Sequence, residues 1–141
     1  MKCLLLNSPI YRERSEAKED YLPPLGLGYI ATHLSDSGID VGIIDCVKER
    51  YGVNEIFELI TQQQPEFIGI NIFTQNYKIV KEIIENCPVE ATLIIGGQVV
   101  KSIYNEILQW DVKKSLVIVI GEGELLMPTI LNGKELSKNN L

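Results

Sequence analysis

Short apolar runs alternate along the chain with segments whose apolar residues recur every three or four positions. The apolar runs, which are typical of buried strands, cover residues 2–6, 40–45, 67–73, 91–97 and 115–120. Helical spacing follows each run, as at Leu27, Ile30, Ala31 and Leu34, and Gly38 then stands where a helix-ending glycine is expected. Five strands that are each followed by a helix predict right-handed crossovers and a parallel sheet.

The expected fold is therefore a three-layer α/β domain, Rossmann-like or flavodoxin-like, with a five-stranded parallel sheet in the order 2-1-3-4-5. The almost continuous apolar character of residues 67–73 favours a central strand. In such sheets ligands bind beyond the carboxyl ends of the strands. The segments to examine for function are therefore 7–26, 73–77, 96–99 and 121–124.

Charge and composition exclude some functions. The net charge is −6, whereas nucleic acids and anionic membranes need clustered Lys and Arg, so we expect neither partner. No apolar stretch reaches the roughly 20 residues of a transmembrane helix, and Met1 leads into no recognisable signal peptide. Cys3, Cys46 and Cys87 are far apart, odd in number and fit no disulfide framework or zinc spacing, which predicts a reducing, cytoplasmic location. We expect them to be small buried residues.

One glycine motif resembles a dinucleotide fingerprint. Residues 26–31, "GLGYIA", match G-x-G-x-x-A, and Asp45 ends the next apolar run. A dinucleotide site needs its first glycine in the turn directly after the first strand. Here that strand ends near Asn7 and Gly26 comes much later. We therefore expect these glycines in the first turn of a helix, with Pro24 opening it, and no NAD or FAD site.

Two other activities of this fold are also disfavoured. A phosphoacceptor receiver domain needs an acidic pair after its first strand, where this chain has Asn7-Ser8-Pro9, and an Asp at the end of its third, where it has Phe73-Thr74. A flavodoxin needs a loop rich in Ser, Thr and Gly after the first strand, and the segment "NSPIYRERSEAKED" is a poor match.

Small and polar residues nevertheless follow several strands. The candidate ligand-binding residues are Asn7, Ser8, Pro24, Gly26, Phe73, Thr74, Gln75, Asn76, Gly96, Gly97, Gln98, Gly121, Glu122 and Gly123. Adjacent glycines allow a ligand to approach the backbone closely, and amides at helix starts can bind phosphate. Structural alternatives stay open: an ordinary turn at Gly96-Gly97, helix capping by Thr74 or Asn76, and first-turn acids at Glu122 and Glu124.

Together, several segments resemble a known family. The segments are "NSP", "PPLGLGYIATHLSDSGIDVGIID", "PEFIGINIFTQN", "LIIGGQ" and "IGEGE", in the same order over nearly the whole chain. They look like the N-terminal cobalamin (B12)-binding domain of B12-dependent radical SAM proteins. The resemblance implies a Rossmann-like domain, residues 1–132, that holds cobalamin over the carboxyl edge of its sheet. Residues 133–141 would be a tail leading toward a radical SAM core.

The sequence departs from related families at two points. Classical B12 domains carry D-x-H-x-x-G after the first strand, and its histidine binds the cobalt. Here that loop has no histidine, and His33 lies off the predicted buried face of the first helix, so we expect bound cobalamin to lack a protein His ligand. The Cys-x-x-x-Cys-x-x-Cys motif of a radical SAM core, which would hold a [4Fe–4S] cluster, is also missing from these residues.

The expected function is therefore that of a cofactor-binding domain. The resemblance implies a full enzyme, with a radical SAM catalytic domain as partner and S-adenosylmethionine as a second cofactor, that transfers methyl groups. These residues alone offer no catalytic group and no metal ligand set, so we do not expect an enzyme by itself. The alternative is a non-catalytic flavodoxin-like interaction module that has lost ligand binding.

Overall fold

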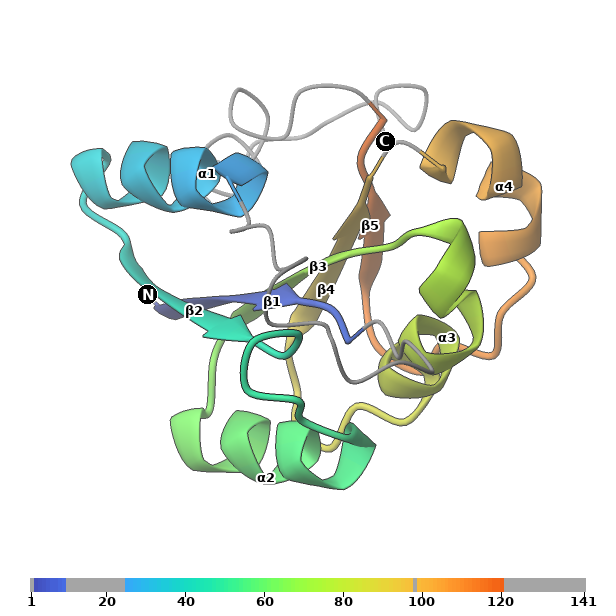
Figure 1. Ribbon diagram of the computed structural model, residues 1–141, viewed down its shortest axis with the longest axis horizontal. Helices are drawn as coiled ribbons and strands as arrows, with labels where there is room; N and C mark the ends of the chain where they lie inside the picture. The colour runs from blue at the N-terminus through green and yellow to red at the C-terminus, as the bar shows by residue number, and fades with distance from the viewer. Residues whose placement is uncertain (1, 10–24, 98, 121–141) are drawn as a thin grey trace.

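The computed structural model describes residues 2–9, 25–97 and 99–120, which form alternating strands and helices (Figure 1). In chain order they are β1 (Lys2–Asn7), α1 (Leu25–Asp36), β2 (Asp40–Asp45), α2 (Val53–Gln63), β3 (Phe67–Asn71), the 3₁₀ helix η2 (Thr74–Asn76), α3 (Tyr77–Glu85), β4 (Thr92–Gly96), α4 (Val100–Ile107) and β5 (Leu116–Ile118). The expected tail at 133–141 and a helix after β5 lie outside the described residues, and the domain boundary at 132 stays a prediction.

The strands form one parallel sheet in the order β2-β1-β3-β4-β5, which confirms the predicted topology. β3 is central, as its apolar character indicated, and Ile70 pairs with Leu6 on one side and Ile95 on the other. The order reverses between β1 and β3. That switch point directs attention to the loops that follow these two strands.

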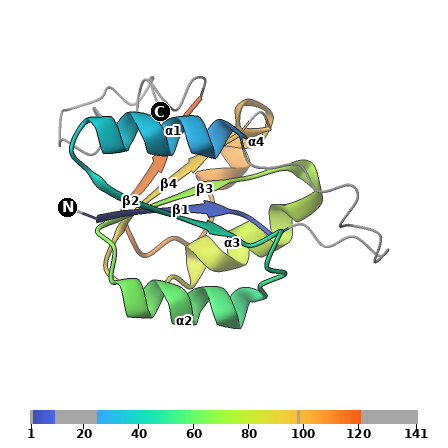
Figure 2. The same ribbon diagram turned by 60° about the vertical axis from the view of Figure 1, so that its left-hand side comes forward.

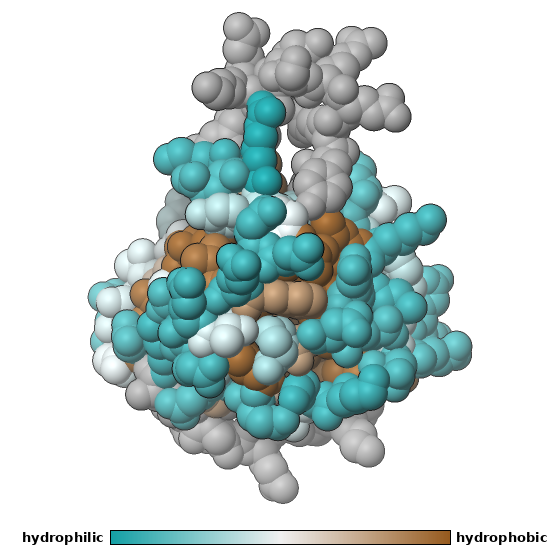
Figure 3. Space-filling model, turned by 90° about the horizontal axis from the view of Figure 1, so that it is seen from below, coloured by the Kyte–Doolittle hydropathy of each residue, from teal (hydrophilic) through white to brown (hydrophobic). Residues whose placement is uncertain are grey.

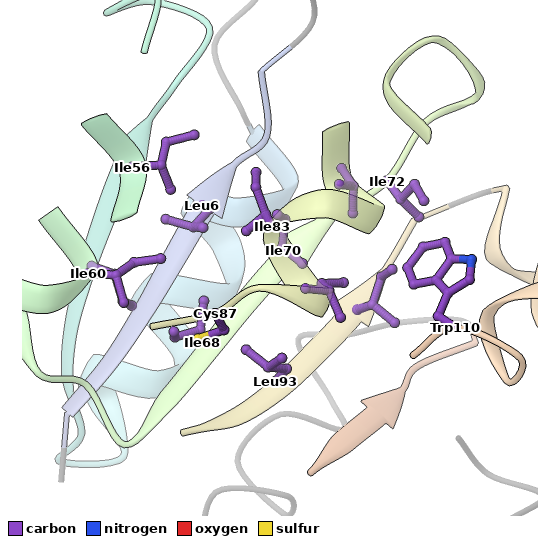
Figure 4. Close-up of a cluster of buried hydrophobic side chains, with 14 of the residues drawn as sticks. Leu6, Ile56, Ile60, Ile68, Ile70, Ile72, Ile83, Cys87, Leu93 and Trp110 are labelled. Carbon is purple, nitrogen blue, oxygen red and sulfur yellow. The ribbon is translucent and has the colours of Figure 1, made fainter. Parts of the chain in front are cut away.

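Helices cover both faces of the sheet (Figure 2). Alternate residues of each strand point to opposite faces, so Cys3 and Leu5 of β1 pack on the side of Leu34 in α1. Leu4 and Leu6 join the larger cluster with α2, α3 and α4. Figure 4 shows this larger core, in which the β3 isoleucines lie among side chains of the surrounding helices. Each fully buried Leu or Ile of this kind stabilises the fold by about 1.5–3 kcal/mol.

The outer surface on the side of α2 is mostly hydrophilic, with apolar residues showing between polar ones (Figure 3). None of the helices among the described residues has the length and apolar character needed to span a bilayer. Apolar residues of α1 pack on one face of the sheet, and those of α2, α3 and α4 on the other.

The only tryptophan of the sequence lies at the edge of the larger core. Trp110 is 8% exposed, packs edge-on against Tyr77 with ring centroids 5.4 Å apart, and donates its indole N–H to the Tyr77 hydroxyl at 3.0 Å. This contact joins α3 to the segment after α4. Because exposure to water changes indole emission, Trp110 is a built-in fluorescent probe of unfolding.

Two local expectations are also confirmed. Gly38 follows α1 with φ +83°, the left-handed conformation that ends helices. All three cysteines are buried. Burial raises the pKa of the Cys3 thiol to about 12, and burial together with the charge of Asp45 does the same for Cys46. These thiols are therefore apolar core groups rather than nucleophiles.

Candidate functional site at the carboxyl edge of the sheet

A row of polar residues and one glycine crosses the sheet where the strands end. Asn7 of β1 pairs with Asp45 of β2, and Asn71 of β3 pairs with Gly96 of β4. The pairing of Leu6 with Ile70 brings Asn7 and Asn71 next to each other on adjacent strands. By the alternation of strand side chains, the whole row faces the α1 side of the sheet.

Hydrogen bonds join this row in one direction. The Asn71 amide nitrogen donates to the Asn7 side-chain oxygen at 3.0 Å, and the Asn7 amide nitrogen donates to Asp45 Oδ1 at 3.0 Å. The same oxygen accepts the Lys48 backbone N–H at 3.0 Å. The chain of donors thus ends on a carboxylate, and a charged acceptor strengthens the bonds that lead to it.

Ser8 connects the end of β1 to β3. It is completely buried, and its backbone N–H donates to Asn71 Oδ1 at 2.8 Å. Its hydroxyl oxygen lies 2.6 Å from the Asn71 backbone carbonyl and 2.7 Å from Asn71 Oδ1, and accepts from Asn76 Nδ2 at 2.6 Å. Because a serine hydroxyl has one proton and two lone pairs, it can donate to Asn71 and accept from Asn76 at once.

Asn76 closes the loop after β3. Its side-chain oxygen accepts the Phe73 backbone N–H at 2.7 Å, so the amide spans the turn that contains Thr74 and Gln75. Asn76 occupies the N-cap position of α3, but no side-chain capping hydrogen bond is made there. The capping alternative is therefore wrong for its side chain. Thr74 and Gln75 are both exposed.

The glycine pair after β4 lies beside the same loop. Gly96 accepts the Ile72 backbone N–H through its carbonyl at 2.9 Å. A Cβ at Gly96 would meet only Val119, at 3.9 Å, which is an ordinary contact. Gly97 differs: its φ is +134°, and a Cβ there would lie 2.5 Å from the Ile72 carbonyl oxygen. The fold therefore requires glycine at 97 whether or not a ligand binds.

The glycines of the fingerprint-like motif lie within α1, whose first residues are Leu25 to Gly28. This confirms that they are not in the turn after β1. An added Cβ at Gly28 would meet no described atom within 4 Å, so the packing of α1 does not require glycine there. His33 is exposed, as predicted, and lies in the last turn of α1, next to the start of β2 rather than its carboxyl end.

The structure thus brings eight of the predicted residues to one edge, in three strand-end segments. They are Asn7, Ser8, Phe73, Thr74, Gln75, Asn76, Gly96 and Gly97. Pro24, Gln98, Gly121, Glu122 and Gly123 lie outside the described residues, and Gly26 is placed only as part of α1. Within the described part, no buried side-chain nitrogen or oxygen lacks a partner, and no group of three His, Cys, Asp or Glu side chains could hold a metal ion.

Two members of the network were missed from the sequence. Asn71 stood inside an expected apolar strand, and Asp45 was considered only as part of a dinucleotide fingerprint. The signal was present as a single polar residue interrupting "FIGINIF". Its meaning depends on strand register, because only the pairing of β1 with β3 places Asn71 beside Asn7.

Comparison with known protein families identifies the family of this chain. Residues 17–131 match the family model of the B12 binding domain. The chain belongs to the B12 binding domain family. The match includes strands β2 to β5, whereas β1 with Asn7 and Ser8 precedes the matched residues. No curated protein matches the chain.

Solved structures of cobalamin-related enzymes share the fold. The radical S-adenosylmethionine methyltransferase TsrM from Kitasatospora setae, solved with tryptophan substrate and a SAM analogue, matches with a TM-score of 0.73 and 18% identity over 95% of this chain and 26% of TsrM. The cobalamin-dependent S-adenosylmethionine radical enzyme OxsB, solved with aqua-cobalamin and S-adenosylmethionine, matches with a TM-score of 0.74 and 19% identity over 96% of this chain and 19% of OxsB. The chain thus spans about a quarter of the length of TsrM and about a fifth of that of OxsB, and the likeness is one of fold.

Proposed function

We propose that this domain binds cobalamin over the carboxyl edge of its sheet and presents it to a radical SAM catalytic domain that transfers methyl groups. The observation that carries the proposal is the membership of residues 17–131 in the B12 binding domain family. The carboxyl edge of the sheet supports the proposal, because three strand-end segments meet there. They carry the exposed polar residues Thr74 and Gln75, and Gly96, where an added Cβ would make only ordinary contacts.

The residues at this edge fit a large ligand rich in amide groups. Thr74 and Gln75 are exposed and can donate or accept hydrogen bonds, and Gly96 presents backbone without a side chain in the row that faces α1. The hydrogen bonds of Asn7, Ser8 and Asn76 would support the site by holding the strand ends and the η2 turn in place. The other proposed members of the cobalamin site are Pro24, Gly26, Phe73, Gly97, Gln98, Gly121, Glu122 and Gly123.

Bound cobalamin would supply a cobalt that carries the methyl group, while the protein's part is binding, orientation and control of the cobalt's lower face. We propose that no protein histidine binds the cobalt. Support comes from the position of His33, the single histidine of the sequence, at the far end of α1 from the strand ends. The edge itself offers amides and hydroxyls, which are weak ligands for a transition metal compared with imidazole.

The catalytic half of the proposed enzyme would come from outside these residues. Its [4Fe–4S] cluster needs three nearby thiolates, whereas Cys3, Cys46 and Cys87 are buried core residues with raised pKa values. TsrM and OxsB, which are several times longer than this chain, support a radical SAM domain as the partner. Methyl transfer is the chemistry named for TsrM.

The absorption spectrum of hydroxocobalamin tests the lower face of the cobalt. On binding to the domain it should change to that of cobalamin with its dimethylbenzimidazole displaced, and His33→Ala should give the same spectrum and affinity. A spectrum that His33→Ala alters would contradict the proposal. An unchanged spectrum with no binding would contradict the proposal and favour the alternative of an interaction module without a ligand.

A further inference from the structure

Both polar atoms of the Asn76 side chain are hydrogen-bonded inside the protein. Asn76 is 3% exposed, its nitrogen donates to Ser8 Oγ at 2.6 Å, and its oxygen accepts the Phe73 N–H at 2.7 Å. A side chain whose two polar atoms are both bonded within the fold has little left to offer a ligand. Its role is therefore to be sought in what it holds in place.

What Asn76 holds is the exposed turn of η2. Thr74 and Gln75 lie between Phe73 and Asn76, and the Asn76 amide bridges the two ends of that turn. The Ser8 hydroxyl then ties the same amide to the end of β1. The two exposed side chains are thus carried on a turn fixed at both ends.

The anchor beneath this turn is itself rigidly held. Ser8 makes three contacts of 2.6 to 2.8 Å with the single residue Asn71, through its backbone N–H and its hydroxyl. Asn71 is in turn bonded to Asn7, and Asn7 to Asp45. The ends of β1, β2 and β3 and the η2 turn therefore form one hydrogen-bonded body, whose bonds are all made without a ligand.

We infer that Asn76 and Ser8 are positioning residues that hold Thr74 and Gln75 in their ligand-binding arrangement before cobalamin arrives. The inference rests on the proposed function, since it assigns these two exposed residues to the same site. Its physical basis is that ordering a loop on binding weakens the affinity, whereas a turn already ordered by the fold avoids that loss.

The test compares two substitutions at one position. Asn76→Leu removes both hydrogen bonds at similar volume, and we expect the dissociation constant for hydroxocobalamin to rise about tenfold. Asn76→Asp keeps an acceptor for the Phe73 N–H but cannot donate to Ser8 Oγ, whose single proton is already donated to Asn71. The turn then keeps only one of its two anchors, so the dissociation constant should rise as well, by about threefold or more.

Asn86→Leu is the matched control. Asn86 is exposed at the other end of α3, and its side-chain nitrogen donates to the Glu82 carbonyl at 3.0 Å. The substitution therefore also removes an amide hydrogen bond, but one far from the η2 turn. Its dissociation constant should not change. Affinities are compared under conditions where Trp110 fluorescence shows each variant to be folded. If Asn76→Leu does not fold, Ser8→Ala breaks the same link with a smaller change and should weaken binding in the same direction.

A second readout needs no cobalamin. Backbone ¹⁵N relaxation should give Thr74 and Gln75 order parameters of about 0.85, the value of rigid backbone, in the wild-type protein. In Asn76→Leu the order parameters should be clearly lower. Mobile residues in the wild type, or an unchanged dissociation constant for folded Asn76→Leu, would overturn the inference. Failure of the wild-type chain to bind would instead overturn the proposed function, and with it the role in binding, even if the turn is ordered.

Discussion

Gly97 lies so close to Ile72 that a Cβ on Gly97 would stand 2.5 Å from the Ile72 carbonyl oxygen. Its φ of +134° is also one that side chains rarely adopt. Gly97→Ala should therefore lower the free energy of unfolding by about 2–4 kcal/mol, from strain and overpacking together. Urea unfolding followed by Trp110 fluorescence measures this. A loss below about 0.5 kcal/mol, which is typical of neutral surface changes, would show that the contact relaxes easily.

The neighbouring glycine separates ligand binding from folding. Gly96→Ala places a Cβ at an ordinary distance from Val119, so the free energy of unfolding should change by less than about 0.5 kcal/mol. The same methyl group would lie on the side of the strand-end residues that we propose faces cobalamin. It should therefore raise the dissociation constant for hydroxocobalamin at least fivefold, roughly the effect of 1 kcal/mol of overpacking.

Gly42→Ala is the control for that experiment. Gly42 lies within β2, pairs with Leu4, and a Cβ there would contact Leu4 Cδ1 at 3.5 Å. It is on the face that packs against α2, away from the carboxyl edge. Its dissociation constant should match that of the wild type. Equal losses of affinity in both variants would mean that Gly96 has no special place in the site.

The sequence predicted the sheet because its apolar runs and helical stripes are strong and regular. The order of the strands, the central place of β3 and the exposure of His33 all follow from that pattern together with the handedness of crossovers. Strand ends were less certain. β3 was expected to reach residue 73 but ends at Asn71, because the chain turns there into η2.

The sequence predicted where the site lies but not how its residues interact. Knowing that ligands bind at strand ends was enough to select Asn7, Ser8 and Asn76. It could not show that Asn76 bonds to Ser8 directly, or that Ser8 and Asn7 are joined through Asn71. Those bonds depend on strand register and side-chain direction. Gly97 was assigned to a ligand because a glycine pair permits close approach. The structure supplies a nearer cause, the Ile72 carbonyl.

The buried thiols predict a loss of stability at alkaline pH. Burial raises the pKa of Cys3 and Cys46 from 9.0 to about 12, so the unfolded thiols ionise first. Their contribution is constant below about pH 9 and is lost as the pH rises toward 12. The slope is about 1.4 kcal/mol per pH unit for each thiol. Urea midpoints measured between pH 9 and 11 should fall less steeply for Cys3→Ala than for the wild type, and equal slopes would contradict the assignment.

The most direct test of the whole account is equilibrium dialysis of the purified 141-residue chain against hydroxocobalamin, with Gly96→Ala and Gly42→Ala alongside. We predict saturable binding of one cobalamin per chain, unchanged in Gly42→Ala and weakened at least fivefold in Gly96→Ala. No saturable binding by the wild-type chain, or binding that Gly96→Ala leaves untouched, would contradict a cobalamin site at the carboxyl edge of this sheet.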